Sequence, residues 1–261
     1  MSGERGDTKN GGVGWPAATL SLDRNRPGAV SVRAAMWPTL KLETEERWFD
    51  ELYVWTEGFQ PGTMQRARIQ LNALGKAFAL LERENVRRVG VTLSFGTVER
   101  CLDLVTDAFD AHRFHTHRIV VLLRGQLDRL RSPYRVRGFI EWLRSMHVPV
   151  GYRLTSPRVS MEMRAIDLVQ PDFAKLLAPT SKRPEFWEDV LLEARAAGLR
   201  GDRLIVAGIE TREQRALAVA AGFGFAQGSA IRPAYDPPSI RTPPTLPPRG
   251  ETAAAVDDTS S

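Results

Sequence analysis

Three histidines stand close together in the sequence and could supply imidazole ligands for a metal ion. His112, His115 and His117 are spaced so that two or three rings could converge on one point. The run directly precedes an apolar segment, residues 118–123, that has the composition of a buried strand. In α/β barrels the loops that carry chemistry follow the strands and do not precede them. We therefore interpret the three histidines as part of a solvated loop and predict no metal site.

Alternating strand-like and helix-like segments must position any chemistry in this chain. Segments 18–22 and 29–36 are separated by a short turn cluster, so we expect them to form an antiparallel pair. Further strands are expected at 86–94, 118–123, 148–154, 172–177 and 203–206. Helices are expected at 45–56, 63–84 and 98–109, from Ser132 onward, and at 184–198.

The segment Ile205–Pro233 is the clearest structural unit. Thr211 lies three residues before Gln214, which is the spacing of a capping box at the start of a helix. Gly222 closes that helix at a position where a residue free to adopt positive φ is favoured. A short strand and an open loop follow. Two junctions from strand to loop in one unit are typical of an α/β barrel.

Composition and length limit the possible classes of protein. The chain has 261 residues and 43% hydrophobic residues, which suits one barrel of about 250 residues. No apolar run is long enough to span a bilayer, and the polar N-terminus lacks the apolar core of a signal peptide. A single cysteine excludes an internal disulfide framework. We expect a cytoplasmic protein with a barrel at 17–235, a disordered tail at 1–16 and a Pro-rich disordered tail at 236–261.

The charge balance permits an acidic or phosphate-bearing partner. The formal net charge is +5, and almost all of the basic residues are arginines. A solvated arginine surface is the more common cause of such a balance. No aromatic residues interleave with the charges as single-stranded nucleic acid would require, so we predict no specific nucleic acid partner.

The segment Ile205–Pro233 resembles the end of EAL domains, the cyclic-di-GMP phosphodiesterases. The resemblance implies a TIM-like (β/α)8 barrel of EAL type whose first strand is antiparallel. The antiparallel pair expected at the start of the chain agrees with it. The matching residues, in order, are Glu210, Thr211, Gln214, Gly222, Gln227, Gly228 and Pro233.

Active EAL domains cleave cyclic-di-GMP with two divalent metals held mainly by carboxylates. At the matching positions this chain lacks nearly all of those ligands. Ala207 stands where one family glutamate is expected, and Trp37 where the family has an arginine that grips a phosphate of the dinucleotide. The other replaced ligand positions are Arg33, Thr92, Leu123, Arg153, Leu154 and Leu177. The resemblance therefore predicts a degenerate domain that is not an enzyme and uses no metal or cofactor.

Lys175, Glu210 and Gln227 match positions of the family's active site and are kept. With Arg153, which could offer a positive charge to a phosphate, they are the candidate ligand-binding residues. The alternative is structural: a lysine beside a glutamate in a barrel mouth can be an ion pair between two partly buried charges.

Two functions from different classes remain open. The first is a catalytically inactive regulatory or protein-interaction module in bacterial signalling, with a protein partner; a homodimer is left open. The alternative is a receptor that binds cyclic-di-GMP without cleaving it. An active cyclic-di-GMP phosphodiesterase ranks below both because the metal carboxylates are missing. No membrane partner is expected.

Overall fold

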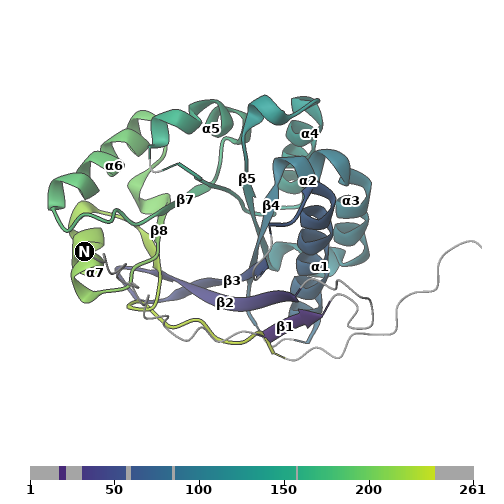
Figure 1. Ribbon diagram of the computed structural model, residues 1–261, viewed down its shortest axis with the longest axis horizontal. Helices are drawn as coiled ribbons and strands as arrows, with labels where there is room; N and C mark the ends of the chain where they lie inside the picture. Colours follow the sequence, from purple (N-terminus) through teal and green to yellow (C-terminus); the bar gives the residue numbers. More distant parts are fainter. Residues whose placement is uncertain (1–17, 22–30, 57–59, 84–85, 157, 239–261) are drawn as a thin grey trace, which may run out of the picture.

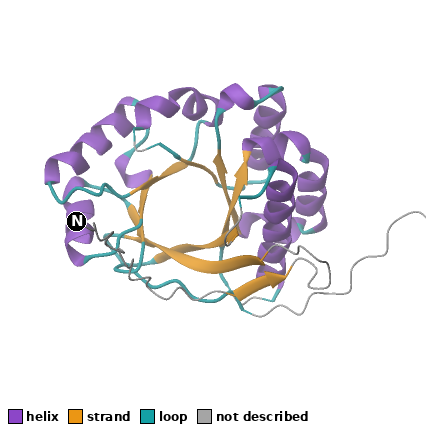
Figure 2. Cartoon of the chain, viewed as in Figure 1, coloured by secondary structure: helices purple, strands orange, loops and turns teal. Residues whose placement is uncertain are grey.

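The computed structural model describes residues 18–21, 31–56, 60–83, 86–156 and 158–238. Its centre is a closed barrel of eight strands, β2 to β9, with helices packed around the outside (Figures 1 and 2). The strands are β1 (Ala18–Ser21), β2 (Ser31–Lys41), β3 (Arg47–Thr56), β4 (Val89–Ser94), β5 (Ile119–Arg124), β6 (Val150–Arg153), β7 (Phe173–Leu177), β8 (Leu204–Ala207) and β9 (Phe225–Gln227). The α-helices are α1 (Thr63–Glu82), α2 (Phe95–Arg100), α3 (Leu102–Ala111), α4 (Pro133–Ser145), α5 (Met163–Val169), α6 (Pro184–Ala196) and α7 (Arg212–Ala221).

The first strand of the barrel runs antiparallel to both of its neighbours. Strand β2 pairs antiparallel with β3 on one side and with β9 on the other, while β3 to β9 are parallel in sequence order. Strand β1 pairs with the edge of β2 outside the barrel. The predicted α/β barrel with an antiparallel first strand is therefore confirmed.

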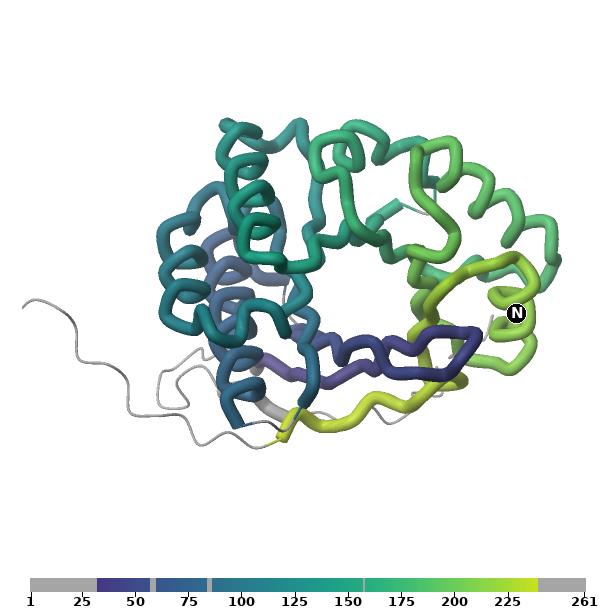
Figure 3. The backbone as a smooth tube through the Cα atoms, turned by 180° about the vertical axis from the view of Figure 1, so that it is seen from behind, coloured from purple at the N-terminus to yellow at the C-terminus, as the bar shows by residue number. Residues whose placement is uncertain are grey.

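The C-terminal part of the described chain reinforces this closure. The backbone of Tyr235 exchanges two hydrogen bonds with Met36 of β2, at 2.8 and 3.1 Å. The segment that follows β9 therefore runs along β2, as Figure 3 shows from behind. The two ends of the described barrel stabilise each other.

The helix predicted at 45–56 is wrong, because this segment forms strand β3. Trp48, Leu52 and Trp55 have a spacing that imitates one face of a helix. The segment is nevertheless rich in aromatic and β-branched residues, which favour a strand. Its inward positions include a charged residue, Glu51, so the alternation of a half-buried strand is not visible as hydrophobicity.

Several local predictions are confirmed. Thr211 accepts a hydrogen bond from the backbone N–H of Gln214 at 3.1 Å and completes the capping box of α7. Gly222 ends that helix at φ 93°. The helix predicted at 98–109 is interrupted at Cys101, which separates α2 from α3.

Aromatic and aliphatic side chains fill the lower half of the barrel, at the N-terminal ends of the parallel strands. Glycines make room for two of them: a Cβ on Gly90 would lie 2.6 Å from the Phe49 ring, and one on Gly151 would lie 2.3 Å from the Phe173 ring. Because this end is filled, the polar side chains nearer the C-terminal ends of the same strands face the other end of the barrel, which we call the mouth. The plug consists of Phe49, Val120, Leu122, Phe173 and Ile205, with Trp48 and Phe225 packed against it.

The predicted tails fall largely outside the described residues. This applies to all of 1–16 and to 239–261 of the Pro-rich segment. The domain limits at 17 and 235 therefore remain predictions. Among the described helices, none is long and apolar enough to cross a membrane.

Candidate functional site: the barrel mouth

A buried carboxylate, Glu51 of β3, lies at the centre of a polar cluster inside the barrel. It is only 1% exposed. Lys175 of β7 donates a hydrogen bond from Nζ to Oε2 of Glu51. Thr92 of β4 donates to Oε1 at 3.1 Å, and Nη1 of Arg153 on β6 lies 3.9 Å from the same oxygen. Side chains from three other strands thus contact this carboxylate. We call Glu51 and the side chains around it, Lys175, Thr92, Arg153 and Gln227, the Glu51 cluster.

Gln227 of β9 links this cluster to the strand that closes the barrel. Its Oε1 accepts a second hydrogen bond from Lys175 Nζ. Its Nε2 lies 3.1 Å from the Trp37 carbonyl oxygen, 3.2 Å from Thr39 Oγ1 and 3.3 Å from Glu51 Oε2. All of the side chain's polar atoms are therefore used within the protein.

The charges of the cluster depend on each other. Burial by itself raises the pKa of Glu51, but Lys175 and then Arg153 outweigh it, and the pKa lies below its ordinary value. Burial lowers the pKa of Lys175, and Glu51 opposes that effect. Because Lys175 Nζ has an oxygen acceptor on two sides, we treat the two groups as an ion pair. Such a pair is costly to break, since the remaining charge stays buried without its partner.

Above the cluster lies a cavity of about 770 Å³ at the C-terminal ends of β3 to β6. Five arginines line it, and among the described lining residues Glu99 alone is acidic. The Glu99 carboxylate already accepts a hydrogen bond from the backbone N–H of Ser132, at 2.5 Å. The cavity is therefore strongly positive. The arginines are Arg66, Arg100, Arg124, Arg129 and Arg153.

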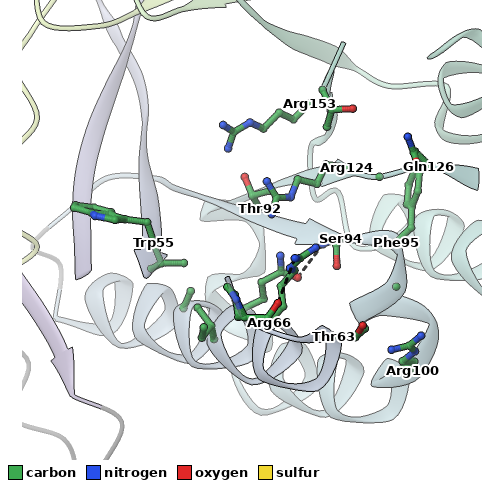
Figure 4. A pocket seen from close by; sticks show the side chains of 18 of the residues that line it. Trp55, Thr63, Arg66, Thr92, Ser94, Phe95, Arg100, Arg124, Gln126 and Arg153 are labelled. Carbon is green, nitrogen blue, oxygen red and sulfur yellow. Dashed lines mark hydrogen bonds between the residues drawn. The ribbon is translucent and has the colours of Figure 1, made fainter. Parts of the chain in front are cut away.

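One of these cations, Arg124, lies at the end of β5. Its side chain is partly buried, and among the described residues no hydrogen bond or ion pair involves its guanidinium. Burial lowers its pKa, and the nearby charges of Arg153 and Arg66 lower it further. Figure 4 shows Arg124 and Arg153 extending from neighbouring strands into the same space.

Aromatic side chains form another wall of the cavity. The rings of Tyr53 and Trp55 stack with centroids 5.8 Å apart, and both residues line the cavity. The guanidinium of Arg153 lies over the Tyr53 ring at 5.4 Å from its centroid. A cavity with cations beside flat aromatic surfaces suits a ligand that carries both phosphate and aromatic rings.

The structure brings together three of the four predicted ligand-binding residues. Lys175, Gln227 and Arg153 all belong to the Glu51 cluster. Arg153 alone of the four lines the cavity, because Lys175 and Gln227 are 4% and 5% exposed beneath it. Glu210 lies elsewhere: it is exposed, and its backbone N–H donates to Gln214 at the start of α7. The ion pair considered for Lys175 exists, with Glu51 as the partner.

Sequence reasoning missed Glu51 because it looked for the family signature at residues 32–37 and expected a helix at 45–56, where the structure has strand β3. Arg33 and Trp37 lie on the antiparallel β2, paired with Trp55 and Glu51 across the sheet. On the first parallel strand, β3, the glutamate Glu51 faces the interior of the barrel.

Other predicted replacements also need correction. Leu123 and Leu154 are buried in the outer core between the strands and the helices, and do not face the barrel. The inward neighbour of Leu123 is Leu122, which belongs to the plug. Thr92 and Arg153 do face the interior, as expected, and Leu177 is 64% exposed at the end of β7.

The residues at the mouth do not fit the two divalent cations that the resemblance implies. Magnesium requires several oxygen ligands, many of them anionic. Glu51 already binds Lys175, and the cavity above it is lined with arginines that would repel a cation. Within the described ranges, no group of three or more His, Cys, Asp or Glu is placed to hold a metal. The histidine run does not form the solvated loop that we expected: His112 stacks on Phe78 and contacts Glu82 at 2.7 Å, and His115 and His117 lie in a 3-10 helix, Arg113–Arg118.

No protein-family model matches the chain, and no curated protein matches it. Solved structures do. They include the PaMucR phosphodiesterase in complex with c-di-GMP, at 16% identity and TM-score 0.58, over 78% of this chain and 97% of that one. The EAL domain of Mycobacterium smegmatis DcpA matches at 15% identity and TM-score 0.60, over 78% and 93%.

A third match is the Bacillus subtilis YkuI protein, with an EAL domain, in complex with substrate c-di-GMP and calcium. It is 14% identical with TM-score 0.57, over 78% of this chain and 55% of that one. These matches contradict the prediction that the chain is not an enzyme. The structures that share its fold include a phosphodiesterase, so the fold gives no ground for denying activity to this chain. The comparisons establish that this chain has an EAL-type barrel fold.

Proposed function

We propose that the mouth of this barrel binds cyclic-di-GMP. The observation that carries the proposal is Arg124, a partly buried cation in a cavity of about 770 Å³ whose guanidinium makes no hydrogen bond or ion pair with the described residues. A buried charge is costly unless it is paired, so the site is suited to a ligand that brings negative charge. Solved structures of the same fold hold cyclic-di-GMP, which supports this choice among phosphate-bearing ligands.

Different parts of the site have different roles in the proposal. Arg124 and Arg153 contact the phosphates, and the stacked pair Tyr53 and Trp55 offers a surface for a guanine base. Lys175 and Gln227 act beneath the ligand by holding Glu51 in place. Glu210 has no role, because it does not line the cavity.

Calorimetric titration of the full chain with cyclic-di-GMP tests the proposal. We expect saturable binding with one site per chain and a dissociation constant on the order of 10 µM or tighter. Linear dinucleotide and GTP serve as competitors for the same site, and analysis of the nucleotide after the titration shows whether it has been cleaved. No heat of binding at several times that concentration would exclude the proposed function.

A regulatory, protein-interaction role in signalling is the second candidate. Three exposed apolar side chains lie in or after the C-terminal ends of β6 and β7: Met161, Leu177 and Phe186 are 74%, 64% and 50% exposed. The partner to test first is a second copy of this chain. Sedimentation velocity of the samples from the titration would show a dimer that Leu177→Glu dissociates. A monomer in all of them would exclude self-association.

A further inference from the structure

The positive charge of the mouth stands where the fold's relatives would place metal ions, according to the resemblance. Arg153 occupies a position at which the family carries a metal-binding aspartate. Its guanidinium now points toward the same cavity as that of Arg124. By the resemblance, a cation of the protein itself stands where a carboxylate would attract a metal ion.

The arrangement of the arginines favours the binding of an anion between them. Arg66 reaches the cavity from the first turns of α1, where its Nη2 makes a long hydrogen bond of 3.4 Å to the Pro61 carbonyl oxygen. Arg153 is 3.9 Å from Glu51, and Lys175 lies closer to that carboxylate. Arg124 lies near both of them, and among the described residues no hydrogen bond or ion pair involves its guanidinium. Without a ligand, the three guanidinium groups repel one another.

When a phosphate binds, guanidinium groups can provide the positive charge that a metal ion would otherwise provide. An arginine keeps its charge at any physiological pH and offers planar, paired donors that match two phosphate oxygens. Unlike a divalent cation, it requires no set of carboxylates to hold it. The loss of carboxylates at the mouth and the gain of arginines are consistent with one single change of binding mode.

We propose that Arg124, Arg153 and Arg66 form a metal-independent phosphate site that takes the place of divalent cations in binding cyclic-di-GMP. This inference rests on the proposed function and adds how the ligand is held. In this site, Arg124 is the residue that contributes most to phosphate binding. It also explains why a cation is kept in a partly buried position that costs stability.

The test compares binding of cyclic-di-GMP to the full chain in excess EDTA and in excess MgCl₂ or MnCl₂. We expect the same dissociation constant within about twofold in all three buffers. Arg124→Gln is expected to weaken binding at least about tenfold, the loss expected for one charge-assisted hydrogen bond. Arg124→Lys, which keeps the charge but loses the paired donors, should fall between the two.

A second readout separates ligand binding from a structural role. Arg124→Gln removes the repulsion with Arg153 and Arg66, so we expect its Tm without nucleotide to rise by about 2 to 4 °C. Arg66→Gln and Arg68→Gln form a matched pair on α1, since both side chains are exposed but only Arg66 lines the cavity. We expect weaker binding for Arg66→Gln and unchanged binding for Arg68→Gln.

The outcomes distinguish the two proposals. Binding that appears only with a divalent cation would overturn the metal-independent site and leave the proposed function standing. Binding in EDTA that Arg124→Gln does not weaken would overturn the role of these arginines. The absence of binding in every buffer would overturn both proposals.

Discussion

At the scale of single residues, the charges inside this barrel are used in two different ways. Glu51 and Lys175 satisfy each other in the interior, and both are almost fully buried. Arg124 and Arg153 stand above them and face a cavity. The first pair is satisfied within the protein, and the second pair is the one that we propose to bind the ligand.

The ion pair makes a testable prediction about stability. We expect Lys175→Met to lower the free energy of unfolding by about 3–5 kcal/mol, because Glu51 then remains buried without its closest cation. Glu51→Gln should cost a similar amount. The double variant should cost clearly less than the sum, because neither charge is left alone. Urea denaturation of the three variants measures this coupling.

An exposed ion pair provides the control for that experiment. Arg215 contacts Glu45 near the surface, where their side chains are 38% and 65% exposed. Glu45→Gln should change the free energy of unfolding by less than about 1 kcal/mol. Additive losses in the buried pair, with no coupling between Glu51 and Lys175, would contradict the role we assign to it.

At the scale of elements, the barrel depends on close approach between neighbouring strands. Gly151 of β6 lies beside Phe173 of β7, with no space for a Cβ between them. The ring of Phe173 belongs to the plug that fills the lower barrel. These contacts fix the position of β6, and therefore of Arg153 at its end.

Two glycine-to-alanine substitutions are expected to have opposite effects. Gly151→Ala places a Cβ 2.3 Å from the Phe173 ring and should cost about 1–3 kcal/mol through overpacking. Gly75→Ala lies within α1 with nothing within 4 Å of the added Cβ, so it should stabilise the protein by about 0.5–1 kcal/mol. Thermal or urea unfolding compares the two variants. Phe173→Leu should partly rescue Gly151→Ala, and equal effects of the two alanines would contradict the packing described.

At the scale of the whole molecule, the fold could be predicted from the sequence better than the site. Hydrophobic periodicity, the Thr211–Gln214 capping box and the turn after residue 22 act over short distances, and they predicted the barrel and its antiparallel start. The centre of the site could not be predicted in this way. Lys175 meets Glu51 across 124 positions of the chain, and Glu51 lay in a segment with an apparent helical spacing.

The arginines illustrate the same limit. The sequence showed an excess of arginine, which is most simply interpreted as a solvated surface. Only the order of the parallel strands places the ends of β5 and β6 next to each other, so that Arg124 and Arg153 share one cavity. Part of the excess of arginine is therefore concentrated at the mouth of the barrel.

The most direct test of metal-independent binding at the mouth is a crystal structure of the full chain grown with saturating cyclic-di-GMP in the presence of EDTA. We predict nucleotide in the mouth of the barrel, with phosphate oxygens within hydrogen-bond distance of Arg124 and Arg153 and a base against Trp55. Glu51 should remain paired with Lys175 beneath it. An empty mouth with the nucleotide bound elsewhere on the surface would contradict the account.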